Sequence, residues 1–198
     1  MNLNELQLDA LREMSNIGSG NAATALASML GQSVDLHVPT ALALELADAV
    51  DAVGHGEDTV SAVIIGVFGD LDATVLLLFE PESANTLCSL LGVEGDPEME
   101  LSALAEIGNI LGSSYVQAMG TMTNLHMEPH PPVAMSDMLG AIVASVLAFT
   151  AADTDLALLL DSRMTVDGTA CKFGFLFVPG GAGVALLLDR LGLGEAAA

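Results

Sequence analysis

The chain has 198 residues, of which 52% are apolar, so it is long enough to bury a sizeable core. It carries 26 aspartates and glutamates against four lysines and arginines, which gives a formal net charge of −22 at pH 7. A surface of this charge repels nucleic acid phosphates and anionic lipids, so the composition excludes nucleic acid and membrane as expected partners.

The acidic residues are spread along most of the chain, with almost no lysine among them. This pattern favours a halophilic protein, because molar salt shortens the Debye length to about 3 Å and screens the repulsion. An ordinary acidic protein is the alternative. The N-terminal residues lack the basic and apolar segments of a signal peptide. The longest apolar run, residues 138–152, is short for a membrane span and indicates buried core structure. We therefore expect a soluble, cytoplasmic protein.

The first predicted element is a helix over residues 6–26. Its apolar stripe, spaced by three residues, is expected to face the core: Leu8, Leu11, Met14 and Ile17. The helix also contains Gly18 and Gly20, and an interior glycine costs roughly 1 kcal/mol relative to alanine. Two explanations are open. The glycines let another macromolecule approach the helix, or they let two helices of this chain pack closely.

A second, polar stripe runs along the same helix at spacings of four, three and four residues: Asp9, Glu13, Asn16 and Gly20. Residues at these spacings lie on one helix face. Asparagine is a poor choice for a merely solvated face, because its side chain competes with the helix for hydrogen bonds. For one such stripe alone a solvated face is the simpler interpretation, and a second stripe with the same residues and spacing would favour a functional face.

Residues 69–79 are predicted to form an apolar strand, and residues 84–91 a short helix. Pro81 lies before this helix and Gly92 directly after it, which is the usual placement of these residues at helix ends. A polar segment, residues 93–100, then links to the second part of the chain.

The second part repeats the first at an offset of 93 residues. Six positions match in register: Ala10 with Ala103, Leu11 with Leu104, Glu13 with Glu106, Asn16 with Asn109, Ile17 with Ile110, and Pro39 with Pro132. The second polar stripe is Ser102, Glu106, Asn109 and Ser113, with Ser102 in place of Asp9. A strand over residues 172–178 and a helix over residues 184–191 close this part as they close the first.

The repeat predicts an internal duplication. We expect a single α/β domain made of two pseudo-symmetric halves, residues 1–97 and 98–198. Each half would contain a long helix, antiparallel strands and a short helix. Neither half has enough apolar elements to bury a core by itself.

The glutamate and asparagine that recur in both stripes restrict the reactions that this chain could catalyse. Asparagine is neither a nucleophile nor a base, but its amide can accept and donate hydrogen bonds and so position a water molecule. Positioning the attacking water is a catalytic role in phosphoryl transfer. With four lysines and arginines and no metal-ligand cluster, the chain is not expected to hold the phosphate itself. A partner would supply phosphate and metal, and the glutamate would pair with a cation of that partner.

At these residues the sequence resembles the CheC/CheX/FliY family of chemotaxis phosphatases, and CheC most closely. The family signature is Asp or Ser, three residues, Glu, two residues, Asn, 22 residues and Pro. It is matched twice, by Asp9, Glu13, Asn16 and Pro39 and by Ser102, Glu106, Asn109 and Pro132.

The resemblance implies an enzyme that dephosphorylates the response regulator CheY. Asn16 and Asn109 would orient the hydrolytic water, and Glu13 and Glu106 would pair with the regulator's active-site lysine. The remaining signature residues would be supporting positions: Asp9, Ser102, Pro39 and Pro132. The aspartyl phosphate and Mg²⁺ would belong to CheY, so this chain needs no cofactor or metal. Family members also bind CheD. The alternative is a non-catalytic adaptor that holds phosphorylated CheY or CheD.

Three other features are weaker candidates. Residues 18–21, GSGN, lack the preceding strand and following lysine of a phosphate loop. His126, Glu128 and His130 do not share one helix face, so we expect no metal there. Cys88 and Cys171 lie far apart in apolar segments and are expected to be free, buried thiols.

Overall fold

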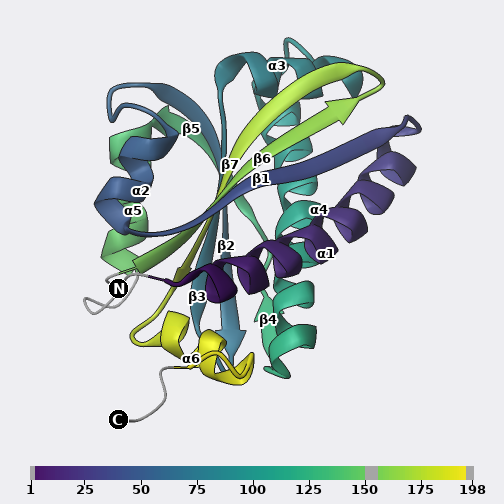
Figure 1. The fold of residues 1–198 in the computed structure, drawn as a ribbon. Coiled ribbons are helices and arrows are strands. Elements are labelled where there is room, and N and C mark those ends of the chain that lie inside the picture. Colours follow the sequence, from purple (N-terminus) through teal and green to yellow (C-terminus); the bar gives the residue numbers. More distant parts are fainter. Residues whose placement is uncertain (1–2, 150–155, 195–198) are drawn as a thin grey trace.

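A computed structural model describes residues 3–149 and 156–194 of the chain (Figure 1). In chain order the elements are α1 (Glu5–Leu30), β1 (Val34–Glu45), α2 (Leu46–Val53), β2 (Thr59–Gly69), β3 (Ala73–Phe79), α3 (Pro81–Leu90), α4 (Pro97–Thr123), β4 (Met127–Pro129), β5 (Val133–Met138), α5 (Leu139–Phe149), β6 (Leu156–Val166), β7 (Thr169–Pro179) and α6 (Gly183–Arg190). The first part follows the order long helix, strand, helix, two strands, short helix, and the second part follows the same order with its first strand divided into β4 and β5. The predicted α/β class and its two pseudo-symmetric halves are therefore confirmed.

The two long helices begin and end at residues suited to those places. Asn4 caps α1: its side chain accepts a hydrogen bond from the Gln7 amide, and the Gln7 side chain accepts one from the Asn4 amide, both at 3.0 Å. Asp96 caps α4 by accepting from the amides of Glu98 and Met99. Because α4 begins at Pro97, the predicted link over residues 93–100 is wrong in its second half, which is helical.

In the described part of the chain, seven strands form one antiparallel sheet in the order β1-β6-β7-β3-β2-β4, with β5 also paired to β2. β3 and β7, the corresponding strands of the two halves, pair at the centre of the sheet. The first strand of each half crosses over: β1 pairs with β6, while β4 and β5 pair with β2. Each half therefore completes the sheet of the other. The division at residues 97 and 98 and the single-domain assignment stay predictions.

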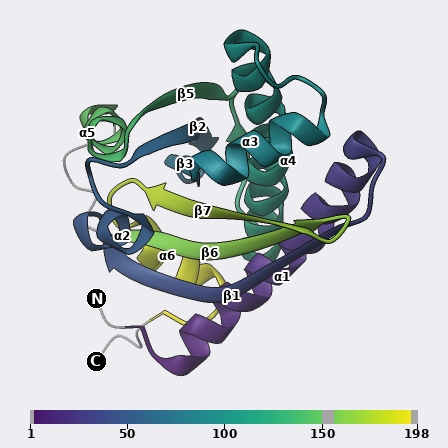
Figure 2. The same ribbon diagram turned by 90° about the horizontal axis from the view of Figure 1, so that it is seen from above.

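Helices cover both faces of the sheet (Figures 1 and 2). The larger core lies between one face and helices α1, α3, α4 and α6, and the smaller core lies between the other face and helices α2 and α5. On β3, Val75, Leu77 and Phe79 belong to the larger core, whereas Leu76 and Leu78 belong to the smaller one. Burial on both faces explains why the central strands are nearly continuous apolar runs.

Several predicted boundaries change. The strand predicted over residues 69–79 is wrong at its start, because Gly69 ends β2 with a φ of 137° and β3 begins only at Ala73. The short helix predicted over residues 84–91 begins earlier, at Pro81. The strand over residues 172–178 lies within β7, and the helix over residues 184–191 corresponds to α6.

The apolar run predicted over residues 138–152 begins with Met138, which is exposed at the end of β5, and continues as α5. The prediction of buried core structure is confirmed at four residues of α5: Leu139, Ile142, Val143 and Val146. Residues 150–152 lie outside the described ones. No helix among residues 3–149 and 156–194 combines the length and apolar character needed to cross a bilayer.

Candidate functional site

The two polar stripes lie on α1 and α4, which pack against each other on the same face of the sheet (Figure 1). All four residues of the α1 stripe are exposed: Asp9, Glu13, Asn16 and Gly20. The opposite side of the helix is buried, at Leu11, Met14, Ser15 and Gly18 among others. The stripe therefore faces away from the core.

The predicted apolar stripe of α1 is wrong at Ile17, which does not face the core. Its side chain is 39% exposed and lies next to Asn16 in the sequence. With about 3.6 residues per turn, Ile17 lies nine residues or about two and a half turns after Leu8, which places the two on opposite sides of the helix. A spacing of three drifts around a helix, so Ile17 belongs to the exposed side rather than to the core.

The α4 stripe is less exposed than the α1 stripe. Ser102 and Glu106 are exposed, whereas Asn109 and Ser113 are half-buried. The Ser113 hydroxyl donates a hydrogen bond of 3.4 Å to Oδ1 of Asn109. Gly20 occupies the position of Ser113 in α1 and has no side chain to orient Asn16. The two stripes thus share residue types and spacing but differ in how the asparagine is held.

Glu13 and Glu106 present free carboxylates. Among residues 3–149 and 156–194, neither side chain takes part in an ion pair or a hydrogen bond. Asp9, by contrast, pairs with Arg12 at 2.5 Å on the surface of α1. The sequence prediction omits Arg12, although its spacing of three residues from Asp9 signals such a pair. Position 105 of α4 corresponds to Arg12 and is an alanine, so this cation is particular to the first stripe.

The contact between α1 and α4 is fixed by a buried tyrosine. Tyr115 of α4 is 1% exposed, and its hydroxyl lies 3.0 Å from the Ser19 hydroxyl of α1. Burial raises the pKa of Tyr115, and hydrogen bonds with Ser19 and Ser162 partly oppose that rise. The Tyr115 ring packs on Phe175 of β7, with ring centroids 4.5 Å apart. These contacts hold α1, α4 and the sheet in one arrangement and so fix the relative positions of the two stripes.

The helix glycines have two different roles. A Cβ on Gly18 would lie 2.7 Å from Cδ1 of Tyr115, and a Cβ on Gly108 would lie 2.7 Å from Cβ of Val63 in β2. Gly112 is likewise pressed against Ile65 of β2. At these three positions close packing within the chain is the explanation. Gly20 has nothing within 4 Å and is exposed, so of the four it alone leaves open the approach of another molecule.

We expect Gly108→Ala and Gly20→Ala to change stability in opposite directions. The methyl group on Gly108 meets the stiff, β-branched Val63, and overpacking of this kind costs about 1–3 kcal/mol. The methyl group on Gly20 meets no atom, and alanine gains roughly 1 kcal/mol in a helix interior. Denaturant unfolding of both variants checks this expectation. A Gly108→Ala variant as stable as Gly20→Ala would contradict the assignment of Gly108 to close packing.

The two signature prolines lie at corresponding interruptions of strand pairing. Pro39 is in β1, and the register of β1 against β6 shifts between His37 and Thr40. Pro132 lies between β4 and β5, which pair with separate parts of β2. Because proline has no amide hydrogen to donate, it is tolerated where a ladder is broken at a sheet edge.

The histidines and cysteines that were weaker candidates make packing contacts or are buried. The ring of His130 packs on Phe68, with centroids 4.3 Å apart, and residues 3–149 and 156–194 contain no group of three potential metal ligands. That the chain uses no cofactor stays a prediction. Cys88 and Cys171 are free and buried, as predicted. Burial raises the pKa of both thiols, and the charge of Glu100 raises that of Cys88 further.

Comparison with known proteins points to one family. The model of the CheC-like family matches residues 6–42 and 99–136, and each segment contains one complete stripe with its proline. The CheY-P phosphatase CheC of Bacillus subtilis (strain 168) is 32% identical over 170 residues, which cover 82% of this chain and 81% of that protein.

Two further relatives share the fold or part of the sequence. The flagellar motor switch phosphatase FliY of Bacillus subtilis (strain 168) is 28% identical over 137 residues, which are 66% of this chain but 35% of FliY. The crystal structure of FliY from Thermotoga maritima superposes with a TM-score of 0.77 at 19% identity, covering 97% of this chain and 98% of that one.

Proposed function

The chain belongs to the CheC-like family, and on that premise we propose that it accelerates the dephosphorylation of phosphorylated CheY. The observation that carries the proposal is the pair of exposed stripes, each with a free glutamate and, one turn later, an asparagine. The two stripes are two pseudo-equivalent sites, one on α1 and one on α4.

In the proposed mechanism an asparagine enters the CheY active site. Its amide oxygen accepts a hydrogen bond from water and its amide nitrogen donates one, which directs the water oxygen in line with the phosphorus. The new bond to water forms as the bond between phosphorus and the aspartyl oxygen breaks, which leaves a free carboxylate and inorganic phosphate. Asn16 and Asn109 contribute by positioning, and the Mg²⁺ and the phosphoryl group are those of CheY.

The glutamates dock the partner. An exposed carboxylate without a partner is free to pair with a lysine of CheY, and Glu13 and Glu106 are both in that condition in the described residues. In each stripe the glutamate lies one helical turn before the asparagine. Pairing of the glutamate with CheY therefore fixes the position of the asparagine side chain in the complex. Asp9, Ser102, Pro39 and Pro132 support this arrangement.

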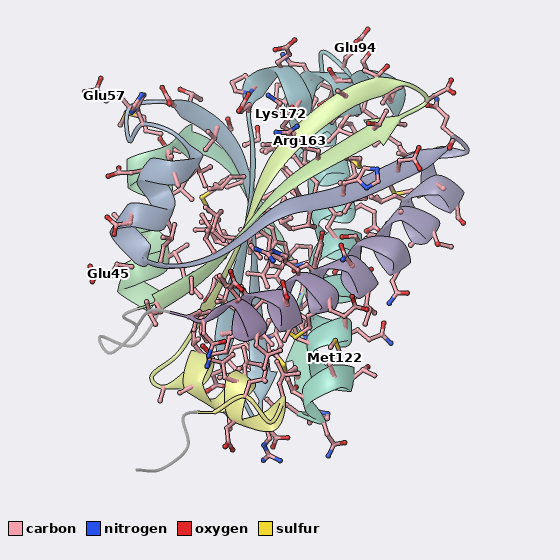
Figure 3. The ribbon with its side chains drawn as sticks, viewed as in Figure 1. Glu45, Glu57, Glu94, Met122, Arg163 and Lys172 are labelled. Atoms are coloured by element: carbon pink, nitrogen blue, oxygen red, sulfur yellow. The ribbon has the colours of Figure 1, made fainter. Side chains whose placement is uncertain are left out.

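Charge reversal tests the docking role. We expect Glu13→Lys with Glu106→Lys to weaken association with phosphorylated CheY by about tenfold or more, because like charges then face each other. Glu57→Lys with Glu94→Lys is the matched control, since both glutamates are exposed and lie outside α1 and α4 (Figure 3). Affinity is measured with CheY that carries a non-hydrolysable phosphoryl mimic. Equal losses in the two double variants would assign the effect to general electrostatics instead.

The decay of phosphorylated CheY, with and without this chain in molar KCl, tests the proposed function itself. A faster decay at catalytic amounts of the chain supports the phosphatase. Binding without faster decay would instead support the alternative, an adaptor that holds phosphorylated CheY. Binding to CheD stays a prediction that a separate binding measurement tests.

A further inference from the structure

Two of the four lysines and arginines of this acidic chain lie opposite each other in the sheet. Arg163 of β6 and Lys172 of β7 are partners in the antiparallel register, and Figure 3 shows them close together. Directly opposite residues have Cβ atoms about 4.5–5.5 Å apart, and like charges in such a pair are destabilising. The chain was expected to hold no phosphate because it has only four cationic side chains. The structure places two of these four side by side.

These cations line a cavity on the face of the sheet away from the two stripes. Along their strands they alternate with Met164 and Cys171, which belong to the larger core beneath α1 and α4, so Arg163 and Lys172 point to the other face. The cavity has a volume of about 250 Å³. Its apolar wall is formed by Val53, Val60, Leu78 and Leu159.

Within the described residues, neither Arg163 nor Lys172 forms an ion pair. Glu80 also lines the cavity but lies beyond ion-pair distance of both cations. Asp161 is near in register, opposite Gly174, and His37 of β1 is opposite Arg163, which adds a third nitrogen-bearing side chain to the row. Among the side chains that the structure describes, no carboxylate lies within ion-pair distance of these two exposed cations at the cavity mouth.

We propose that this cavity binds a small phosphate monoester. Arg163 donates two parallel hydrogen bonds to the phosphate and Lys172 supplies a second charge, while the body of the ligand packs on the apolar wall. A bound dianion neutralises two charges that otherwise repel each other. The site is independent of the proposed phosphatase sites, because it lies on the opposite face of the sheet from α1 and α4.

Calorimetric titration with inorganic phosphate and with phenyl phosphate tests the proposal. The titrations use the whole chain at constant ionic strength in KCl, at a concentration where circular dichroism shows it folded. We expect saturable binding of one equivalent, with phenyl phosphate tighter because its ring contacts the apolar wall. Arg163→Gln and Lys172→Gln should each weaken binding about tenfold, and Glu80→Gln should strengthen it, since a carboxylate repels the ligand.

Arg190→Gln is the matched control, because it removes the same charge from the last turn of α6 and should leave binding unchanged. Should Arg163→Gln fail to fold, Arg163→Lys keeps the charge, removes the paired donors and should bind with intermediate affinity. The absence of saturable binding, or equal losses in Arg163→Gln and Arg190→Gln, would overturn the site. Binding of inorganic phosphate without tighter binding of phenyl phosphate would overturn the role of the apolar wall.

Discussion

The double variant Asn16→Ala with Asn109→Ala is expected to lose the acceleration of CheY-P decay, by about a hundredfold or more. Removing one positioned hydrogen-bonding group from a transition state typically has an effect of this size. Asn16 is exposed and Asn109 is half-buried, so replacing them with alanine leaves the buried apolar core in place and removes only the hydrogen bond between Ser113 and Asn109. The measurement is the first-order decay of phosphorylated CheY at a fixed amount of each variant.

Three controls make this result specific. Each single variant should keep part of the rate, because the other site remains. Unfolding curves should show the double variant folded, since alanine favours helices more than asparagine does. Association with CheY that carries a phosphoryl mimic should persist through Glu13 and Glu106. An unchanged rate in a folded double variant would remove the asparagines from the proposed mechanism.

The stability of the chain is expected to depend strongly on salt. Its net charge of −22 is nearly uncompensated, and the one ion pair within 4.0 Å among the described residues joins Arg12 and Asp9. The Debye length is about 10 Å at 0.1 M salt and about 3 Å at 1 M, so molar KCl screens most of the repulsion. We expect the midpoint of thermal unfolding to rise by about 10 °C or more between these concentrations, which corresponds to a few kcal/mol for a domain of this size.

A variant with fewer charges separates screening from other effects of salt. Glu45, Glu57 and Glu94 are exposed and lie on different parts of the surface (Figure 3). Changing all three to glutamine should raise the midpoint at low salt and flatten its dependence on KCl. A midpoint of the natural chain that is flat from 0.1 M to 1 M would refute the halophilic interpretation. The proposed phosphatase activity would be unaffected, because it rests on the two stripes and not on the net charge.

The sequence by itself determined the features that depend on local spacing. The two long helices and the polar stripes follow from helical periodicity and from the repeat at 93 residues, and both are present on α1 and α4. The repeat also predicted two corresponding halves with an α/β fold. It did not locate α2, which has only eight residues, and it did not identify α5 as a helix, because a continuous apolar segment has no periodicity that separates helix from strand.

Only the tertiary structure decided the features that depend on register between distant segments. The exchange of first strands between the halves, the contact of Gly108 with Val63, and the opposition of Arg163 and Lys172 each join elements whose pairing no local pattern specifies. The side of a helix that is buried is similarly set by its neighbours, which is why Ile17 is exposed beside Asn16. The spacing of side chains along one helix is fixed by backbone geometry, whereas contacts between elements depend on how the whole chain buries its apolar surface.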